Sequence, residues 1–294
     1  MDNTAVASVR RFNREVAGRI GALSDHFLGR ARPMGEARTL WEIGPDGIDV
    51  RDLRAILGLD SGYLSRVLRS LEEQGLVTVR PGREDRRVRR VELTATGRAE
   101  RIELDRRSDI LAGEVLEPLT GRQRAVLLAG MAEVERLLRA SQVRFAIEAP
   151  GSADAQWSIG QYFAELDARL EGGFDPARSI SADVRELTPP AGLLVLARVH
   201  GRPIGCGALK LHEGAPAEVK RMWVAPADRG TGLGRRLLAE LERHARDAGV
   251  AVLRLETNAT LGEAIALYRS AGFTDVPAFN DEPYAQHWFE KRLA

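Results

Sequence analysis

The stretch "APADRGTGLGRRLLAELERHAR", residues 225–246, has three alternating glycines directly before an amphipathic run. A glycine loop that opens a helix suits phosphate groups, because the helix N-terminus offers unpaired N–H groups and a positive dipole end. A dinucleotide fingerprint needs G-x-G-x-x-G, and Arg235 occupies the third glycine position. A P-loop needs a lysine that is absent here. The pattern [QR]-x-x-G-x-[GA] is matched in full by Arg229, Gly232 and Gly234, so a phosphate-holding loop of this third kind is predicted.

Length and composition set the frame. A chain of 294 residues can form two domains that each bury a core, and 44% hydrophobic with 29% charged residues is typical of soluble proteins. No apolar run approaches the roughly 18 residues of a membrane span, and "MDNTAVASVRRFNREV" lacks a signal-peptide core, so we expect a cytoplasmic protein that meets no membrane. The single cysteine, Cys206, excludes an internal disulfide and is expected to be buried. The five histidines are scattered, so no metal site is predicted.

Charge is informative locally rather than globally. The net charge of +1 does not by itself indicate a nucleic-acid partner. Residues 80–90, "RPGREDRRVRR", nevertheless hold six arginines against two acidic residues. A run of this kind is either a solvated surface or a contact for phosphate groups.

The first half of the chain is predicted to be helical, with one hairpin. In "DSGYLSRVLRSLEEQG" the residues Leu64, Val67, Leu68 and Leu71 form one apolar stripe, with Asp60 or Ser61 as the start cap. Strands are expected at residues 76–80 and 88–93, and "TGRQ" at residues 120–123 is a capping box. The other predicted helices cover residues 12–27, 35–44, 49–59, 94–119 and 120 to about 139.

From Val143 onwards, strand and helix patterns alternate. Strands are predicted at 143–149, 192–199, 202–212, 217–225, 250–257 and 287–293, and helices at 154–170, 232–249 and 261–272. We therefore expect two domains, an all-α winged helix-turn-helix domain at residues 1–141 and an α/β domain at residues 142–294.

The order helix, turn, helix, hairpin is typical of DNA-binding proteins, because a helix fits the major groove and a thin hairpin fits the minor groove. The buried stripe leaves one face of residues 60–75 outward, and arginine there suits guanine edges or phosphates. The predicted DNA-binding residues are Ser61, Tyr63, Ser65, Arg66 and Arg69 on this helix, and Arg83, Arg86 and Arg87 at the hairpin tip.

These residues resemble the MarR family of bacterial regulators over roughly residues 5–140. The resemblance rests on the helix at residues 60–75, on Asp85 and Arg87 in the wing, and on the L-T-x-x-G exit at Leu93, Thr94 and Gly97. It implies that Asp85 shapes the wing by a salt bridge while Arg86 and Arg87 reach DNA. It also implies a homodimer built from residues 12–27 and 98–139, which binds a palindromic operator in double-stranded DNA.

A strand followed by [QR]-x-x-G-x-G and a helix resembles the GNAT acetyltransferase family, which holds coenzyme A in this way. The resemblance runs from about Val143 to Ala294 and implies acetyl-CoA as the donor. Glycine permits the backbone to curl close to a pyrophosphate because it has no Cβ. The backbone of Met222, Trp223 and Val224 is implied to pair with the pantetheine arm, and Asn258 to bond it. The predicted loop contacts are Arg229, Gly230, Thr231, Gly232, Leu233, Gly234 and Arg235.

The same resemblance assigns two catalytic roles. Glu218, eleven residues before Arg229, has the position of the general-base glutamate in several GNAT enzymes, where it takes a proton from the amine directly or through water. Tyr268, in "AIALY", is implied to protonate the departing thiolate. Simpler interpretations are an edge-strand residue for Glu218 and a core aromatic for Tyr268.

The acceptor is left open by the sequence. Asp281 and Glu282 in the last loop carry the charge that attracts an amine, but exposed loop acids usually have no specific role, and His212 and His287 are expected to be surface or packing residues. The acceptor class remains a small amine, an amino acid, an antibiotic, a peptide or a protein. Two functions compete, an N-acetyltransferase regulated by its MarR half and a transcription factor whose GNAT half senses acetyl-CoA or a ligand without turnover.

Overall fold

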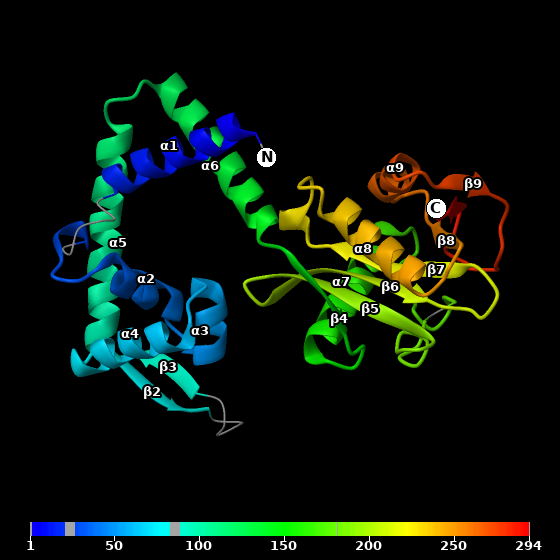
Figure 1. Cartoon of the computed structure of the whole chain (residues 1–294), viewed down its shortest axis with the longest axis horizontal. Coiled ribbons are helices and arrows are strands. Elements are labelled where there is room, and N and C mark those ends of the chain that lie inside the picture. Colours follow the sequence, from blue (N-terminus) through cyan, green and yellow to red (C-terminus); the bar gives the residue numbers. More distant parts are fainter. Residues whose placement is uncertain (1, 21–26, 83–88, 181, 294) are drawn as a thin grey trace. The chain divides into compact units, whose positions relative to one another are not determined.

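The computed structural model describes residues 2–20, 27–82, 89–180 and 182–293, and it divides into two compact units (Figure 1). The first unit is Met1–Gly130 and the second is Met131–Ala294. The helix that spans this division is α6 (Gly121–Ser141), so its last turns are part of the second unit. The capping box that starts α6 is confirmed, because Thr120 N donates to Gln123 Oε1 at 2.9 Å and Gln123 N to Thr120 Oγ1 at 3.3 Å.

The first unit is a helical domain with a three-stranded sheet in the order β1-β3-β2. Helix, turn, helix and hairpin follow one another as predicted. Its other elements are α1 (Asn3–Arg19), η1 (Phe27–Gly29), α2 (Met34–Ile43), β1 (Ile48–Asp49), α3 (Val50–Leu57), α4 (Ser61–Glu73), β2 (Val77–Pro81), β3 (Arg89–Leu93) and α5 (Ala95–Leu116).

The exit from the hairpin into α5 explains why the sequence needs Thr94 and Gly97 there. Thr94 Oγ1 accepts from Gly97 N at 3.0 Å, which caps α5, and donates to Gly75 O at 2.7 Å. A Cβ on Gly97 would lie 1.9 Å from Leu76 O, so only glycine fits. The L-T-x-x-G pattern is therefore a packing requirement between the hairpin and α5.

The core of the first unit joins the predicted stripe of α4 to its neighbours. Leu64, Val67, Leu68 and Leu71 are all buried, as predicted. Beside this core, Glu100 of α5 accepts hydrogen bonds from Arg30 at 3.0 Å and from Arg32 at 3.0 Å. The hydrogen bond from Arg30 holds the pKa of Glu100 below its ordinary value. A buried carboxylate is thus neutralised by two arginines at the base of the domain.

The prediction of one continuous apolar stripe from Phe12 to Phe27 is wrong. Helix α1 ends at Arg19, and Phe27 lies in the short η1, where it packs edge-to-face on Trp41 at 6.0 Å between ring centroids. Phe27 is buried in the core, whereas Phe12 and Val16 are exposed. Helical spacing linked residues that belong to different elements.

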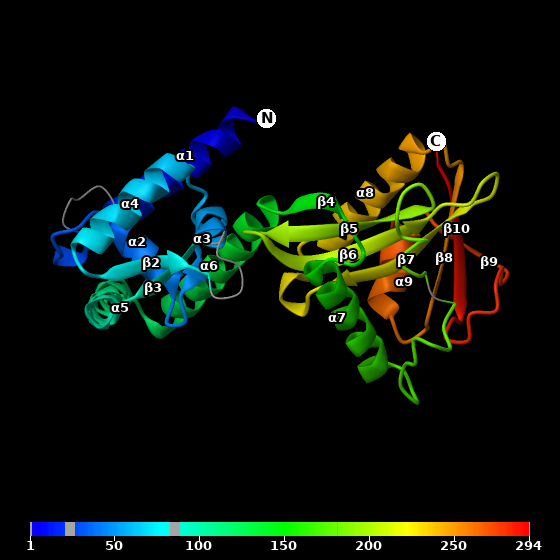
Figure 2. The same cartoon turned by 90° about the horizontal axis from the view of Figure 1, so that it is seen from below.

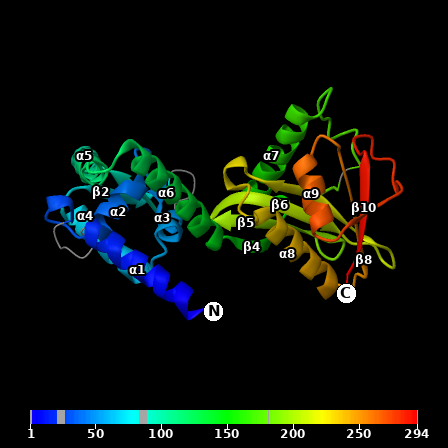
Figure 3. The same cartoon turned by 90° about the horizontal axis from the view of Figure 1, so that it is seen from above.

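The second unit is built on a seven-stranded sheet in the order β4-β5-β6-β7-β8-β10-β9. Figure 2 and Figure 3 show α7 and α8 on opposite sides of this sheet. The sequence predicted all of these elements except β9 and η2, which are three residues each. They are β4 (Arg144–Glu148), α7 (Ala153–Arg169), β5 (Gly192–Val199), β6 (Arg202–Lys210), β7 (Ala217–Val224), η2 (Pro226–Asp228), α8 (Leu233–Asp247), β8 (Val252–Thr257), α9 (Gly262–Ser270), β9 (Thr274–Val276) and β10 (His287–Arg292).

Each face of the sheet has its own core. On one face, Leu237 and Leu241 of α8 pack with Tyr268 of α9 and with Phe289 of β10. On the other face, residues of α7 pack over Cys206 and Trp223. Cys206 is fully buried, as predicted, and burial raises the pKa of its thiol to about 12. The thiol is therefore a packing group, because the reactive form of cysteine is the thiolate.

Candidate active site between β7 and β8

The candidate active site lies where the parallel strands β7 and β8 stop pairing. The strands β7 and β8 pair only at Ala217 with Leu253 and at Glu218 with Arg254. On its other side, β7 stays paired with β6 as far as Val224. After Glu218 the second edge of β7 therefore has no strand partner within the described chain. Its backbone donors and acceptors there are available to a ligand, because an unpaired strand edge readily accepts another extended chain.

The larger of two cavities at this opening has a volume of about 700 Å³. Its walls come from α7, the end of β7, the start of α8 and the helix α9. It brings together most residues predicted to hold the cofactor: Met222, Trp223, Val224, Arg229, Gly230, Gly232, Leu233, Gly234 and Arg235. Thr231 is not among its lining residues, because its hydroxyl donates to Asp228 O at 2.7 Å and so ties the loop to itself.

The loop geometry requires glycine at two positions. Gly230 and Gly232 have φ values of 71° and 80°, in the left-handed region that other residues avoid. Gly232 is also the N-cap of α8, so the first-turn N–H groups of this helix face the cavity wall. Arg235 donates to Ser270 O at 3.1 Å, which fixes the loop against α9. The result is a helix start suited to phosphate oxygens.

A chain of ion pairs crosses the same cavity. Arg229 donates from Nε to Val224 O at 3.0 Å and pairs with Glu165 of α7. Arg169 joins Glu165 at 3.2 Å to Glu263 of α9 at 2.8 Å. The hydrogen bond from Arg169 lowers the pKa of Glu263 to about 2. A ligand that uses the Val224 carbonyl therefore has to displace Arg229 from it.

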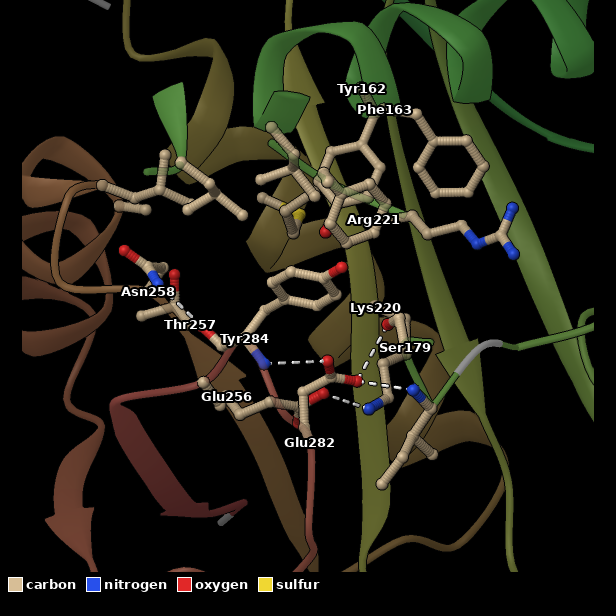
Figure 4. Close-up of a pocket in the computed structure, with 18 of the residues that line it drawn as sticks. Tyr162, Phe163, Ser179, Lys220, Arg221, Glu256, Thr257, Asn258, Glu282 and Tyr284 are labelled. Carbon is tan, nitrogen blue, oxygen red and sulfur yellow. Dashed lines mark hydrogen bonds and ion pairs between the residues drawn. The ribbon is translucent and has the colours of Figure 1, made fainter. Parts of the chain in front are cut away.

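The smaller cavity has a volume of about 110 Å³ and is drawn in Figure 4. It shares lining residues with the larger one. Its lining includes residues of α7, β7, β8 and two long loops. The two cavities share a wall made of Tyr162, Leu166, Met222, Leu261, Ala264 and Tyr268. A donor in the large cavity and an acceptor in the small one would meet at these residues.

Two tyrosines stand at this shared wall. Burial raises the pKa of Tyr268, and it raises that of Tyr162 as well. Both phenols therefore keep their proton at neutral pH. Tyr268 was predicted from the sequence, but Tyr162 was missed because it lies inside the apolar pattern of α7, where an aromatic residue usually indicates core.

Glu256 is the charged residue that sequence reasoning missed. Its side chain is 8% exposed and lines the smaller cavity. One carboxylate oxygen pairs with Lys220, and the other, Oε2, is buried without a hydrogen-bond partner within the described residues. Burial raises the pKa of Glu256, against the opposing charge of Lys220. The signal was strand alternation, since Leu253 and Leu255 face the core and Glu256 faces the opposite side.

Glu218 lies beside the two cavities rather than on their walls, and its role as general base stays a prediction. It lies at the paired start of β7 and is not among the residues that line either cavity. His212 Nε2 and Lys220 Nζ each lie 2.9 Å from its carboxylate. Burial acts to raise the pKa of Glu218, but the hydrogen bonds of Lys220 and His212 and the charges of Lys220 and Lys210 together outweigh it, so the pKa lies below its ordinary value. Glu218 is joined to the cavity through Lys220, which it shares with Glu256.

Asn258 lines the smaller cavity rather than the larger one. Its Nδ2 donates to Tyr284 O at 2.8 Å, and its Oδ1 accepts from Thr260 N at 2.9 Å. Asn258 thereby holds the end of β8 to the loop that precedes β10. Its predicted contact with the cofactor arm stays a prediction.

Glu282 is not the exposed loop acid that the sequence suggested. It is 8% exposed, lines the smaller cavity, and accepts hydrogen bonds from Ser179 Oγ at 2.8 Å and Ile180 N at 2.7 Å. Tyr284 N donates to its second oxygen at 3.3 Å. Figure 4 shows these bonds gathering two loops over the cavity. The expectation of an idle surface acid is wrong because both loops fold over this carboxylate.

The end of α6 contacts the glycine loop from outside. Arg136 Nη1 donates to Gly230 O at 2.7 Å, and Arg139 Nε to Asp228 Oδ1 at 2.7 Å. Asp228 is buried, whereas Arg139 is about half exposed. These turns of α6 lie in the second unit and form part of the support of the loop.

The outward face of α4 carries the predicted DNA-binding side chains. Asp60 is the N-cap, since its Oδ1 accepts from Tyr63 N at 2.8 Å. The Arg66 guanidinium lies over the Tyr63 ring at 5.8 Å from its centroid, and Ser65 Oγ donates to Ser61 O at 2.7 Å. Ser61, Tyr63, Ser65, Arg66 and Arg69 are all exposed. Arg83, Asp85, Arg86 and Arg87 lie outside the described residues.

Three helices expose apolar side chains. Helix α1 has no buried residue, and its apolar side chains Val9 and Phe12 are half exposed or more. On α5 the exposed apolar residues are Ile102 and Ile110, and on α6 they are Val126, Leu128, Met131, Val134, Leu137 and Leu138. Exposed apolar stripes of this extent are typical of surfaces that another chain covers.

Two absences hold for the described part of the chain. It contains no cluster of three or more histidine, cysteine or acidic side chains placed to hold a metal ion. Its helices include none that is long and apolar enough to cross a membrane.

Comparison with protein families finds two matches in this chain. Residues 158–273 match the acetyltransferase (GNAT) family, and residues 31–88 match the MarR family. The first range contains the glycine loop and both cavity-wall tyrosines, and the second contains α4.

Individual relatives include two proteins named as acetyltransferases. An IAA acetyltransferase of Azospirillum brasilense is 43% identical over 131 residues, which are 44% of this chain and 84% of that protein. The N-alpha-acetyltransferase RimI of Mycobacterium tuberculosis is 42% identical over 119 residues, 40% of this chain and 73% of that protein. A GNAT acetyltransferase of Elizabethkingia anophelis, solved with acetyl-CoA bound, is 17% identical with a TM-score of 0.38, over 52% of this chain and 99% of that one.

Proposed function

Since this chain belongs to the GNAT acetyltransferase family and carries a MarR-family domain, we propose that it transfers the acetyl group of acetyl-CoA to an amine and binds DNA as a regulator. The observation that carries the first activity is the pair of adjoining cavities. A large one is lined by a glycine loop at a helix start, and a small one meets it at Tyr268.

The donor would occupy the larger cavity. Its pyrophosphate suits the first-turn N–H groups of α8, and Gly230 and Gly232 permit the close approach of the backbone. Its extended pantetheine arm suits the unpaired edge of β7 at residues 222–224, as an added strand would. The thioester then reaches the wall that both cavities share.

The reaction would be direct transfer. An uncharged amine attacks the thioester carbonyl, the new C–N bond forms, and the C–S bond breaks. A carboxylate takes one proton from the ammonium, and Tyr268 gives its proton to the departing thiolate and regains one from the nitrogen of the new amide. Atoms and charge then balance without a covalent enzyme intermediate.

Two carboxylates compete for the role of proton acceptor. Glu218 is the candidate that family resemblance suggests, and its route to the cavity runs through Lys220. Glu256 lines the cavity itself, has an oxygen without a partner in the described chain and has a raised pKa. We favour Glu256, because a base must reach the proton it removes and works best with a pKa near the operating pH.

The first unit supports the second activity. Arg66 and Arg69 lie exposed on α4, the helix expected to enter the major groove. The exposed apolar stripes of α1, α5 and α6 fit a second copy of this chain, and a two-fold dimer would read a palindromic operator. Replacing Arg66 by Ala should weaken binding to duplexes selected from a random library by about 1–3 kcal/mol. Unchanged gel-shift affinity for those duplexes would remove Arg66 from base recognition.

One contact favours the second candidate function, in which acetyl-CoA acts as a signal. Arg136 and Arg139 belong to α6, and they bond the loop expected to hold the cofactor. Ligand binding at the loop would then change the contacts of α6, which is one of the helices expected to form the dimer. Turnover distinguishes the two functions. A sensor binds acetyl-CoA in calorimetry but releases no free CoA when any amine is added, whereas a transferase releases it.

The test of the proposed enzyme is therefore twofold. Calorimetry should give binding of acetyl-CoA to the full chain, and a screen of primary amines should give free CoA together with an acetylated product in mass spectra. Absence of both would reject the transferase. Running the screen with and without selected operator DNA measures whether the two activities are linked.

A further inference from the structure

The smaller cavity limits the size of the acceptor. Its volume is about 110 Å³, less than the roughly 150 Å³ that accommodates benzene in an engineered protein cavity. By that scale it holds about four or five non-hydrogen atoms. The part of the acceptor next to the thioester is therefore short and slender.

The wall of the cavity is rich in aromatic rings. Phe163 packs on Phe174 at 5.5 Å between ring centroids, and Phe174 packs on Tyr284 at 4.9 Å. Tyr162 lies beside Phe163 on α7 and also lines the cavity. Aromatic faces accept alkyl groups and attract cations, so this lining suits an ammonium carried on a short hydrocarbon body.

The charges at the cavity favour a cation over an anion. Both oxygens of Glu282 already accept hydrogen bonds, but Glu256 Oε2 is buried with no partner within the described residues. The two basic groups at the wall are engaged, Lys220 by Glu218 and Glu256, and Arg221 by Ala182 O at 2.5 Å and the Phe163 ring. A carboxylate on the acceptor would thus face Glu256 and Glu282 without a basic group left to receive it.

The rim of the cavity is held closed by hydrogen bonds. Glu282 ties the segment at Ser179 and Ile180 to the loop before β10, as Figure 4 shows. Asp175 N donates to Tyr284 OH at 2.9 Å, which pins a second point of the same rim. A folded protein or a long peptide would have to break this set of bonds to place its amine inside.

From these four observations we propose that the acceptor is a small primary alkylamine without a carboxylate beside the amine, held by its ammonium on Glu256 within the aromatic wall. This inference rests on the proposed transferase function and names its substrate class. The ammonium gives one proton to Glu256, the amine attacks the thioester carbonyl, and the C–S bond breaks. CoA leaves as the thiol with the proton of Tyr268, which regains one from the nitrogen of the new amide.

The experiment compares matched amines with the full chain. The amine 3-methylbutylamine and the amino acid leucine differ only by the carboxylate on the carbon that bears nitrogen. Spermidine adds further positive charge and length, and trialanine offers a peptide N-terminus. We expect kcat/KM for 3-methylbutylamine to exceed that for leucine by about 100-fold or more, because like charges placed together cost several kcal/mol.

Variants locate the ammonium. Glu256→Gln should raise KM for 3-methylbutylamine by about tenfold or more, because it removes a charge-assisted hydrogen bond, while KM for acetyl-CoA stays within about twofold. Glu256→Asp keeps the charge and should restore part of the loss. Glu290→Gln is the matched control, since Glu290 pairs with Arg254 at 2.9 Å on the neighbouring strand and lines neither cavity.

The possible outcomes distinguish failure of the alkylamine inference from failure of the proposed transferase function. Acetylation of leucine, spermidine or trialanine at an equal or higher kcat/KM overturns the alkylamine inference and leaves the transferase standing. Binding of acetyl-CoA without acetylation of any of these amines also overturns the inference and favours the sensor. If acetyl-CoA itself does not bind, the proposed function fails. The ratio of the two matched amines is measured on the unaltered chain, so it does not depend on variants that fold.

Discussion

The two adjoining cavities differ in how the chain builds them. The larger one includes two short continuous stretches, the end of β7 and the glycine loop into α8, together with residues of α7 and α9. The smaller one collects single residues from α7, β7, β8 and loops near residues 180 and 284. A continuous stretch carries its own geometry, whereas a collected site exists only after folding. The glycine loop of the larger cavity can therefore be predicted from the sequence, whereas the set of residues around the smaller cavity cannot.

Exchange of the carboxylates by amides is the sharpest way to break this comparison. We expect Glu256→Gln to lower kcat by about 10²–10⁴, as loss of a general base does, and Glu218→Gln to lower it by less than about tenfold. Steady-state rates of CoA release with 3-methylbutylamine measure both. The reverse order would return the role of base to Glu218 and make Lys220 the relay.

The pH profile sharpens the same contrast. Burial raises the pKa of Glu256, whereas the pKa of Glu218 is lowered by Lys220 against the effect of burial. The base must be ionised, so kcat/KM should fall about tenfold per pH unit once the pH drops below the pKa of the free base. If Glu256 is the base, this acid limb lies above the ordinary glutamate value of 4.5 and disappears in Glu256→Gln. A limb below that value would indicate Glu218.

Backbone strain tests the donor side. Gly232→Val should weaken acetyl-CoA binding by at least about tenfold, because a left-handed backbone costs a non-glycine residue about 1–2 kcal/mol and the α8 start shifts. Gly214→Val is the control, since Gly214 also has a positive φ of 70° and a Cβ there meets nothing within 4 Å. Calorimetry showing equal affinity in both variants would refute the phosphate-loop assignment.

The tyrosine at the shared wall should have a moderate effect. Tyr268→Phe removes the proton offered to the thiolate and leaves the ring packed against Phe289. Thiolate leaves readily, so we expect kcat to fall by about tenfold, less than for a general acid that assists a poor leaving group, with both KM values unchanged. Tyr162→Phe is the comparison, and a larger loss there would assign the proton to Tyr162.

The smallest expected effect is at the outer support of the loop. Arg139→Ala removes a partly exposed ion pair with Asp228 and should weaken acetyl-CoA binding by about two- to fivefold, the range of such pairs. Arg243→Ala on α8 removes another exposed pair that does not touch the loop and should leave affinity unchanged. Equal affinity of the two variants for acetyl-CoA would show that the contact from α6 does not contribute to cofactor binding.

The elements themselves were largely predictable from local pattern. The buried stripe of α4, the capping box at Thr120 and the succession of strands and helices along the second unit follow from spacing, and the structure has them. The failures have a physical cause too. Phe27 continued the spacing of α1 but belongs to η1, and the three-residue β9 is too short to show a period.

The sequence by itself determined the glycine loop before α8 and the helix-turn-helix, because glycine freedom, capping and apolar spacing act between residues a few positions apart. Only the tertiary structure decided that Glu256 has a buried oxygen without a partner in the described chain, that Glu282 is enclosed by two loops, and that Glu218 lies outside both cavities. These properties depend on how far β7 and β8 stay paired and on which segments fold over the gap. Burial and partnership are set by contacts between distant segments, and no local pattern encodes them.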